Sequence, residues 1–137
     1  MDNRVEVEAG QVRIIGPRGL IDEAALADVE RLYFAYPLRT FYHGAVAYYL
    51  SLFPDRLWVL PFFTTNLGAF VSAVAPALEA RGALFDAHVP RCPRVWRRRL
   101  LGLFPLSPAP HLGSHPLRTL PALVQVKPVP ASEMVCQ

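Results

Sequence analysis

A run of 22 residues without a formal charge, from Leu57 to Leu78, is the feature that most limits the folds open to this chain. An apolar helix of that length can cross a bilayer. Residues 40–53 are uncharged as well, so one interpretation is an α-helical membrane hairpin with spans near 41–53 and 57–78. The first of these spans is short for a bilayer, which counts against this interpretation.

The other interpretation divides the run into the first two elements of a βαβ unit. Residues 57–63 are rich in the aromatic and branched side chains typical of a strand, whereas 67–81 carry apolar residues at helical spacing. Residues 64–66 are polar and form a corner that caps the helix, and 83–89 form a second strand. Because an asparagine near the middle of a membrane span is unfavourable, we expect this βαβ unit, with parallel strands and a right-handed crossover.

Residues 4–15 alternate between apolar and polar side chains, as the strands of a β-hairpin do. A two-residue turn at residues 9–10 aligns three cross-strand pairs: Val7 with Val12, Val5 with Ile14, and Glu6 with Arg13. The apolar pairs then share one face and the ion pair lies on the other. The pattern therefore predicts an N-terminal hairpin.

Three further helices complete the predicted fold. Apolar residues at helical spacing predict an amphipathic helix over 22–36. An uncharged helix over 40–53 is expected to be buried, and a short basic helix over 94–104 follows the βαβ unit. We therefore expect a small mixed α/β protein, with one compact domain at 1–104 and a proline-rich, largely extended tail at 105–137.

The composition narrows the class of protein. Apolar residues make up 53% of the chain and charged residues 18%, so the chain can bury a core and is not a charge-driven disordered segment. Two cysteines, Cys92 and Cys136, are too few for a four-cysteine zinc site. The N-terminus lacks the basic start and apolar run of a signal peptide. We expect a cytoplasmic protein without cofactor or metal, with membrane association as the alternative.

The βαβ unit places polar residues at one edge of its sheet. Ligands bind beyond the carboxyl ends of the strands in open parallel sheets. The residues expected at this edge are Thr64, Thr65, Asn66, Asp86, His88 and Arg91. Hydroxyls, an amide and an arginine suit a phosphate or carboxylate, and His88 with Asp86 is a candidate acid/base pair. The simpler interpretation is that these residues only cap the helix and close the strands.

A cluster of basic residues with one tryptophan is the main electrostatic feature. It consists of Arg91, Arg94, Trp96, Arg97, Arg98 and Arg99. On an amphipathic helix, this cluster would lie on an anionic membrane surface. Nucleic acid is a less favoured partner, because only five bases are present and the N-terminal part of the chain is acidic. The arginines can also be a solvated face.

The histidines give weaker signals. His88 and Cys92 are four residues apart, as are His111 and His115. Such spacing occurs in zinc sites, but two pairs separated by proline-rich sequence match poorly. His43 lies in an apolar stretch that is typical of a core histidine.

These observations favour a small non-enzymatic protein-interaction domain, because the sequence shows no complete catalytic constellation. Its apolar helical surface, which includes the small residues at the back of the 67–81 helix, is expected to bind a protein partner or a second copy. One alternative is a small enzyme or ligand binder that uses the anion site of the βαβ unit. The other is a membrane-associated protein with spans near 41–53 and 57–78.

Overall fold

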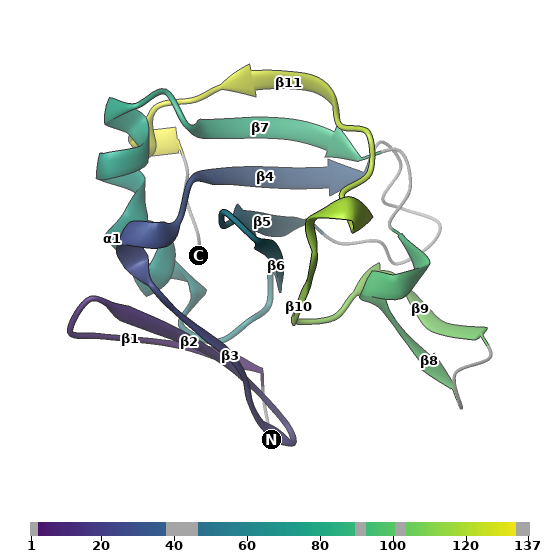
Figure 1. Ribbon diagram of the computed structural model, residues 1–137. Helices are drawn as coiled ribbons and strands as arrows, with labels where there is room; N and C mark the ends of the chain where they lie inside the picture. The colour runs from purple at the N-terminus through teal and green to yellow at the C-terminus, as the bar shows by residue number, and fades with distance from the viewer. Residues whose placement is uncertain (1–2, 38–46, 90–92, 101–103, 134–137) are drawn as a thin grey trace.

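The computed structural model describes residues 3–37, 47–89, 93–100 and 104–133. The fold is built mainly from strands (Figure 1). An N-terminal antiparallel sheet has the order β1-β2-β3, and a larger sheet has the order β10-β6-β5-β4-β7-β11. The strands of the first sheet are β1 (Arg4–Glu8), β2 (Gln11–Gly16) and β3 (Gly19–Ala25). Those of the second are β4 (Arg31–Pro37), β5 (Tyr48–Leu52), β6 (Arg56–Pro61), β7 (Leu84–Val89), β10 (Gly113–Pro116) and β11 (Val124–Pro128).

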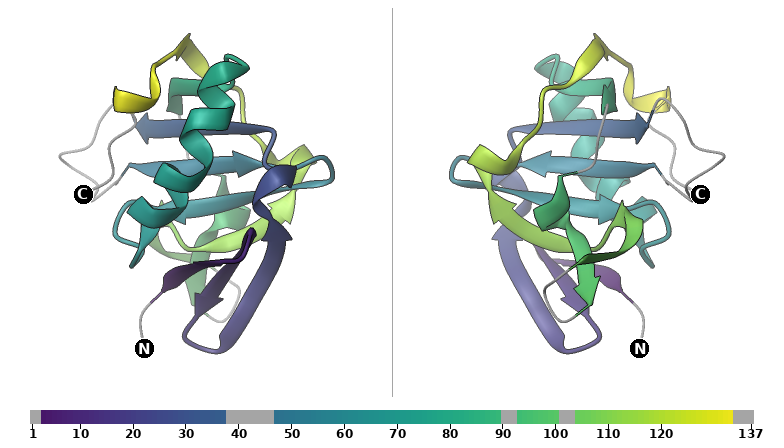
Figure 2. Two further views of the ribbon diagram at one scale, coloured as in Figure 1. Left: turned by 90° about the vertical axis from the view of Figure 1, so that its left-hand side faces the viewer. Right: turned by 90° about the vertical axis from the view of Figure 1, so that its right-hand side faces the viewer.

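Smaller elements connect and cover these sheets. They are the 3-10 turns η1 (Leu26–Asp28), η2 (Arg94–Trp96), η3 (Leu117–Thr119) and η4 (Ala131–Glu133), the ribbon of β8 (Arg97–Leu100) with β9 (Phe104–Pro110), and the helix α1 (Leu67–Ala80). Figure 2 shows α1 lying across one face of the larger sheet, with η2 and the ribbon of β8 and β9 on the opposite side.

The larger sheet has an apolar core on each face. On one face, Tyr49, Trp58 and Leu60 pack with α1 and with the apolar side of the N-terminal sheet. On the other face, Leu50 and Val59 pack with Trp96, and the residues after β10 complete this second core. Because the central strands are buried on both sides, their sequences are apolar almost throughout.

The N-terminal hairpin has the predicted register. Val7 pairs with Val12, Val5 with Ile14, and Glu6 with Arg13. Both residues of the turn, Ala9 and Gly10, have positive φ values (51° and 80°), as two-residue turns that match the twist of the strands require. The alternation of buried valines with charged residues is sufficient to fix this pairing.

The corner at 64–66 is also confirmed, because β6 ends at Pro61 and α1 begins at Leu67. The residues of α1 that face the sheet are Leu67, Phe70, Val71, Val74, Ala75 and Leu78. The helix continues past Pro76 to Ala80. The predicted α-helical membrane hairpin is therefore wrong, and in the described part of the chain no helix has both the length and the apolar character of a membrane span.

The pairing of the βαβ unit was predicted wrongly. The strands before and after α1, β6 and β7, are separated in the sheet by β5 and β4. The parallel neighbour of β7 is β4, with Leu32 opposite Leu84 and Ala35 opposite Ala87. The sequence prediction missed this arrangement because it assigned both intervening strands to helices.

The predicted helices over 22–36 and 40–53 are wrong. Residues 22–25 belong to β3, 31–37 form β4, and 48–52 form β5; residues 40–46 lie outside the described residues. Successive residues of β4 and β5 enter opposite cores. An apolar strand buried on both faces contains residues at i, i+3 and i+4 by necessity, so helical spacing does not distinguish it from a helix.

The predicted basic helix over 94–104 is also wrong. Residues 94–96 form η2, 97–100 form β8, and β9 begins at Phe104 and pairs with β8. The proline-rich sequence after residue 104 supplies both edge strands of the larger sheet, with β10 beside β6 and β11 beside β7. Extended backbone and prolines are compatible with edge strands, where one side of the strand needs no partner.

Candidate functional site

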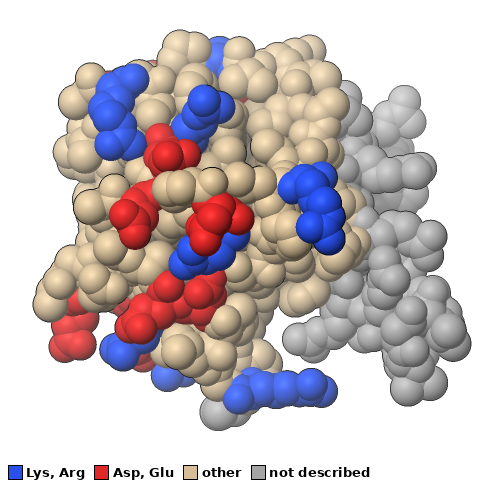
Figure 3. Space-filling view, viewed as in Figure 1, with Lys and Arg blue, Asp and Glu red and all other residues tan. Residues whose placement is uncertain are grey.

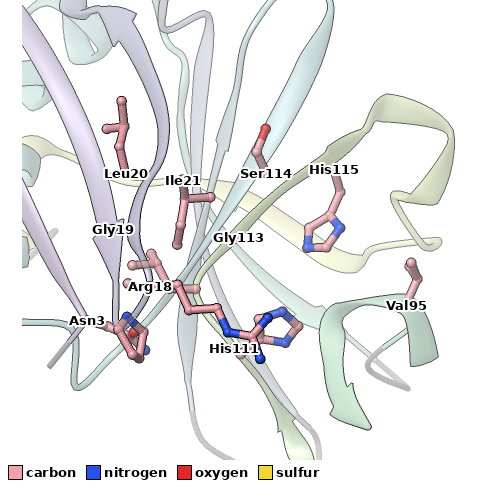
Figure 4. A pocket seen from close by; sticks show the side chains of 13 residues that line it. Asn3, Arg18, Gly19, Leu20, Ile21, Val95, His111, Gly113, Ser114 and His115 are labelled. Carbon is pink, nitrogen blue, oxygen red and sulfur yellow. The ribbon is translucent and has the colours of Figure 1, made fainter. Parts of the chain in front are cut away.

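A cavity of about 890 Å³ lies between the β2–β3 turn, η2 and β10. Its size is within the usual range for pockets that bind small ligands. The aliphatic lining residues are Leu20, Ile21, Val95 and Leu112, and the polar ones are Asn3, Arg18, His111, Ser114 and His115. Figure 4 shows these side chains converging from the N-terminal sheet on one side and from β10 on the other.

The wall from the N-terminal sheet depends on an irregularity in strand pairing. Ile14 pairs with Asp22, but Ile15 pairs with Leu20, so Ile21 is an extra residue in β3. Such a bulge redirects side chains locally. As a result, the consecutive residues Leu20 and Ile21 both line the cavity, which regular alternation along a strand does not permit.

The turn before this bulge carries an arginine that lines the cavity. Residues 16–19 form the turn between β2 and β3. Gly19 has a φ of 116°, a backbone conformation that residues other than glycine rarely adopt. Arg18 is exposed in this turn and extends toward the His111 side of the cavity (Figure 4). Among the residues that the structure describes, it has no carboxylate partner.

Asp22 joins the two walls of the cavity. Its Oδ2 accepts hydrogen bonds from Arg56 Nε (2.6 Å), Trp58 Nε1 (2.8 Å) and Ser114 Oγ (2.9 Å). These donors come from β6 and β10, so one carboxylate ties β3 to the edge of the larger sheet. Burial by itself favours a higher pKa for Asp22, but the hydrogen bonds from Trp58, Arg56 and others outweigh it and lower the pKa.

Two histidines form the opposite wall. The rings of His111 and His115 lie 6.2 Å apart between centroids, at 82° to each other. A Cβ atom on Gly113 would stand 3.0 Å from Nε2 of His115 and 3.8 Å from Nε2 of His111, so the absence of a side chain at Gly113 leaves room for both rings. Figure 4 shows Ser114 and His115 on opposite sides of β10, which lets Ser114 bond Asp22 while His115 enters the cavity.

His115 is held in its neutral form. Burial, with a smaller contribution from the charge of His111, lowers the pKa of His115 to about 4. Its Nε2 atom is buried and has no hydrogen-bond partner within the described structure. The ring of Trp96 lies behind His115, with 6.1 Å between centroids.

The anion site predicted from the βαβ unit is not assembled in this form. Thr65 and Asn66 contact the first strand instead: Thr65 accepts a hydrogen bond from Val5 N–H (3.0 Å), and Asn66 Nδ2 donates one to the Val5 carbonyl (3.1 Å). Thr64 is buried, and its Oγ1 lacks a partner among the described atoms. Thr65 and Asn66 therefore attach β1 to the start of α1.

The other members of that predicted site lie elsewhere. Asp86 and His88 are in β7, and the His88 ring packs against Tyr36 with 4.2 Å between centroids. The strands β6 and β7 are three strand spacings apart, roughly 14 Å, so the structure does not bring 64–66 and Asp86 together. Arg91 lies outside the described residues.

The aromatic residue of the basic cluster, Trp96, is buried in the protein. Trp96 is 0% exposed, and its Nε1 donates a hydrogen bond to Thr119 Oγ1 at 3.0 Å, so this ring is not available to enter a lipid surface or to stack on a base. The side chains of Arg91, Arg94, Arg97, Arg98 and Arg99 lie outside the described structure, as do His43, Cys92 and Cys136. Binding of an anionic surface by these arginines stays a prediction.

The outer face of α1 is exposed. It carries small uncharged residues, namely Ala69, Ser72, Ala73, Pro76 and Ala77. A partner surface requires such exposure, but small residues alone do not identify a partner. On the face seen in Figure 3, acidic and basic side chains intermingle over the N-terminal sheet, where Arg13 and Arg4 pair with Glu6. Protein association through α1 stays a prediction.

Sequence reasoning missed most of the cavity. The spacing of His111 and His115 was visible, and residues 16–19 were recognisable as a turn. No local pattern shows that these two segments, almost a hundred residues apart, face each other. The signal that was available is a pair of apolar residues, Leu20 and Ile21, directly after a Gly-Pro-Arg-Gly turn.

No protein-family model matches the chain, and no curated protein or solved structure is significantly similar to it.

Proposed function

We propose that this protein binds a small organic ligand with an apolar body in the cavity between β3 and β10. The observation that carries the proposal is the position of exposed aliphatic side chains. Leu20, Ile21 and Val95 are 60%, 39% and 48% exposed, and all three line this cavity. Exposed apolar side chains gathered in a concave site, with a few polar groups among them, are typical of ligand pockets.

The rigidity of the two walls supports the same function. Asp22 fixes β3 to β6 and β10, and His115 is backed by the buried Trp96. A preformed pocket loses little conformational entropy when a ligand binds, and this increases its affinity for the ligand.

The experiment is a ligand screen with a variant that fills the cavity. Thermal unfolding and NMR chemical shifts are recorded with a panel of small carboxylates, phosphates, alcohols, amines and aromatic compounds. Val95→Trp places a large ring at the cavity wall, and Val126→Trp makes the same change at an exposed position (44%) of β11. We expect at least one compound to stabilise the native chain and the Val126→Trp variant, but not Val95→Trp.

Two results would contradict the proposal. One is that no compound in the panel changes the melting temperature or the shifts of cavity residues. The other is that the compounds bind Val95→Trp as well as the native chain, which would place their site elsewhere.

A further inference from the structure

We propose that the cavity selects a ligand with a single negative charge, a carboxylate on a short aliphatic body, and that Arg18 binds its head group. The inference rests on ligand binding in the cavity and specifies the ligand class. It is drawn from the charges of the lining, from the partners of the arginines and from the placement of the aliphatic residues.

The cavity lining carries a net positive charge. Among the lining residues that the structure describes, Arg18 is the one arginine or lysine, and none is an aspartate or glutamate. His115 adds no positive charge near neutral pH, because burial and the charge of His111 oppose its protonation. A cationic ligand would meet Arg18 without a compensating carboxylate, so the electrostatics favour an anion.

The carboxylate closest in sequence to Arg18 is already engaged. Asp22 accepts hydrogen bonds from Arg56 and Trp58, and its negative charge is balanced by the ion pair with Arg56. By contrast, the paired arginines of the described chain contact carboxylates: Arg4 with Glu6 (2.9 Å), Arg13 with Glu6 (3.3 Å) and Arg56 with Asp22 (2.6 Å). Arg18 therefore presents its guanidinium donors at the cavity without an internal carboxylate to occupy them.

One guanidinium suits one carboxylate. Its planar donors match the two oxygens of a carboxylate in a bidentate pair. A phosphate monoester carries up to two charges near neutral pH, and the described part of the lining offers one arginine to balance them. The neutral imidazole of His115 and the amide of Asn3 provide further polar groups that do not change the charge of the site.

The aliphatic body has a defined place beside the head group. Leu20 and Ile21 follow Arg18 after one glycine, Gly19, and the bulge in β3 directs both toward the cavity. Val95 and Leu112 line it from the side of η2 and β10. When a carboxylate binds Arg18, its aliphatic chain therefore lies over apolar surface, where the burial of each methylene group favours binding.

The test compares four ligands that each contain six carbon atoms. Hexanoate, 1-hexanol, hexylammonium and hexyl phosphate are titrated at pH 7.5, and dissociation constants are measured by NMR. We expect hexanoate to bind about threefold to fivefold more tightly than hexanol or hexylammonium, the difference expected for an ion pair at an exposed arginine. Arg18→Gln is expected to reduce hexanoate affinity to that of hexanol.

The matched control is Arg31→Gln, which removes the same charge from an exposed position at the start of β4, away from the cavity lining. It should leave hexanoate affinity unchanged. Circular dichroism of Arg18→Gln checks that the fold is retained, as expected for an exposed turn residue.

Each other outcome overturns the inference in a distinguishable way. If hexanol or hexylammonium binds as tightly as hexanoate, or if Arg18→Gln binds hexanoate normally, charge selection is wrong while ligand binding in the cavity stands. If hexyl phosphate binds most tightly, the preferred head group is doubly charged. If none of the four binds, the ligand class is wrong, and the wider panel with Val95→Trp decides whether the cavity binds ligands at all.

Discussion

The carboxylate of Asp22 accepts a hydrogen bond from the indole N–H of Trp58 at 2.8 Å, and this contact joins the N-terminal sheet to the larger sheet. Trp58 is 0% exposed, so its N–H needs an acceptor inside the protein. The same carboxylate oxygen accepts from Arg56 and Ser114. A single side chain therefore sets the distance between the two walls of the cavity.

Replacing Asp22 by asparagine should destabilise the protein. The amide oxygen carries no formal charge and is a weaker acceptor for the three donors, so the buried indole N–H loses a strong partner. The NH2 group of the amide would also face the Glu23 N–H, which donates to Oδ1 of Asp22 at 2.7 Å. We expect the free energy of unfolding in urea to fall by about 2 kcal/mol. Asp28→Asn removes a charge at an exposed position in η1 and should change it by less than about 0.5 kcal/mol. Equal effects of the two substitutions would show that Asp22 has no special role.

Protonation of His115 should make stability depend on pH. Its pKa is about 4 in the folded protein against 6.5 ordinarily, so between these values the unfolded chain binds more protons than the folded one. By linkage, stability then rises with pH from about 4 to 6.5 and levels off above.

Urea unfolding at intervals from pH 4.5 to 7.5 measures this slope. His115→Gln removes the titrating group, so its stability should vary less over this interval than that of the native chain. Asp22 contributes at lower pH: because its folded pKa is lowered from 3.8, its stabilisation is complete above that value and is lost as the pH falls below it. An unchanged slope in His115→Gln would contradict the assignment to this residue.

Local patterns in the sequence correctly predicted the elements that have one buried apolar face and one exposed face. The hairpin of β1 and β2 alternates buried Val5, Val12 and Ile14 with polar residues, and α1 places one face toward the sheet and small residues outward. In both cases the period of the apolar residues identifies the element and its orientation.

The same reasoning failed where a strand is buried on both faces. Tyr33 and Leu32 of β4 enter opposite cores, so the strand has no polar side to reveal its period. Without β4 and β5 as strands, β6 and β7 were predicted to be neighbours, and the ligand site expected between their ends was misplaced. The cavity depends on contacts between β3 and β10, and on a bulge at Ile21, that no local pattern encodes.

Substituting Gly113 by alanine should displace a histidine of the cavity. The new methyl group would stand 3.0 Å from Nε2 of His115, which is too close for an undistorted contact, so the ring must move. Overpacking of this kind costs about 1–3 kcal/mol. We expect altered imidazole NMR signals of His115 and weaker binding of cavity ligands. Unchanged imidazole signals would show that the ring does not lie against Gly113 in solution.

The two tryptophans provide a test of whether the basic cluster binds membranes through its aromatic residue. Trp58 and Trp96 are both 0% exposed, and each indole N–H is bonded inside the protein, to Asp22 and Thr119. Their fluorescence should be emitted at short wavelength and resist quenching by iodide.

Anionic phospholipid vesicles should leave the emission of the native chain unchanged, because insertion of Trp96 would require the second core to open. A change in the emission wavelength, or quenching by a lipid-soluble quencher on adding vesicles, would mean that Trp96 leaves this core. Trp58→Phe isolates the Trp96 signal, and Trp96→Phe serves as its matched control.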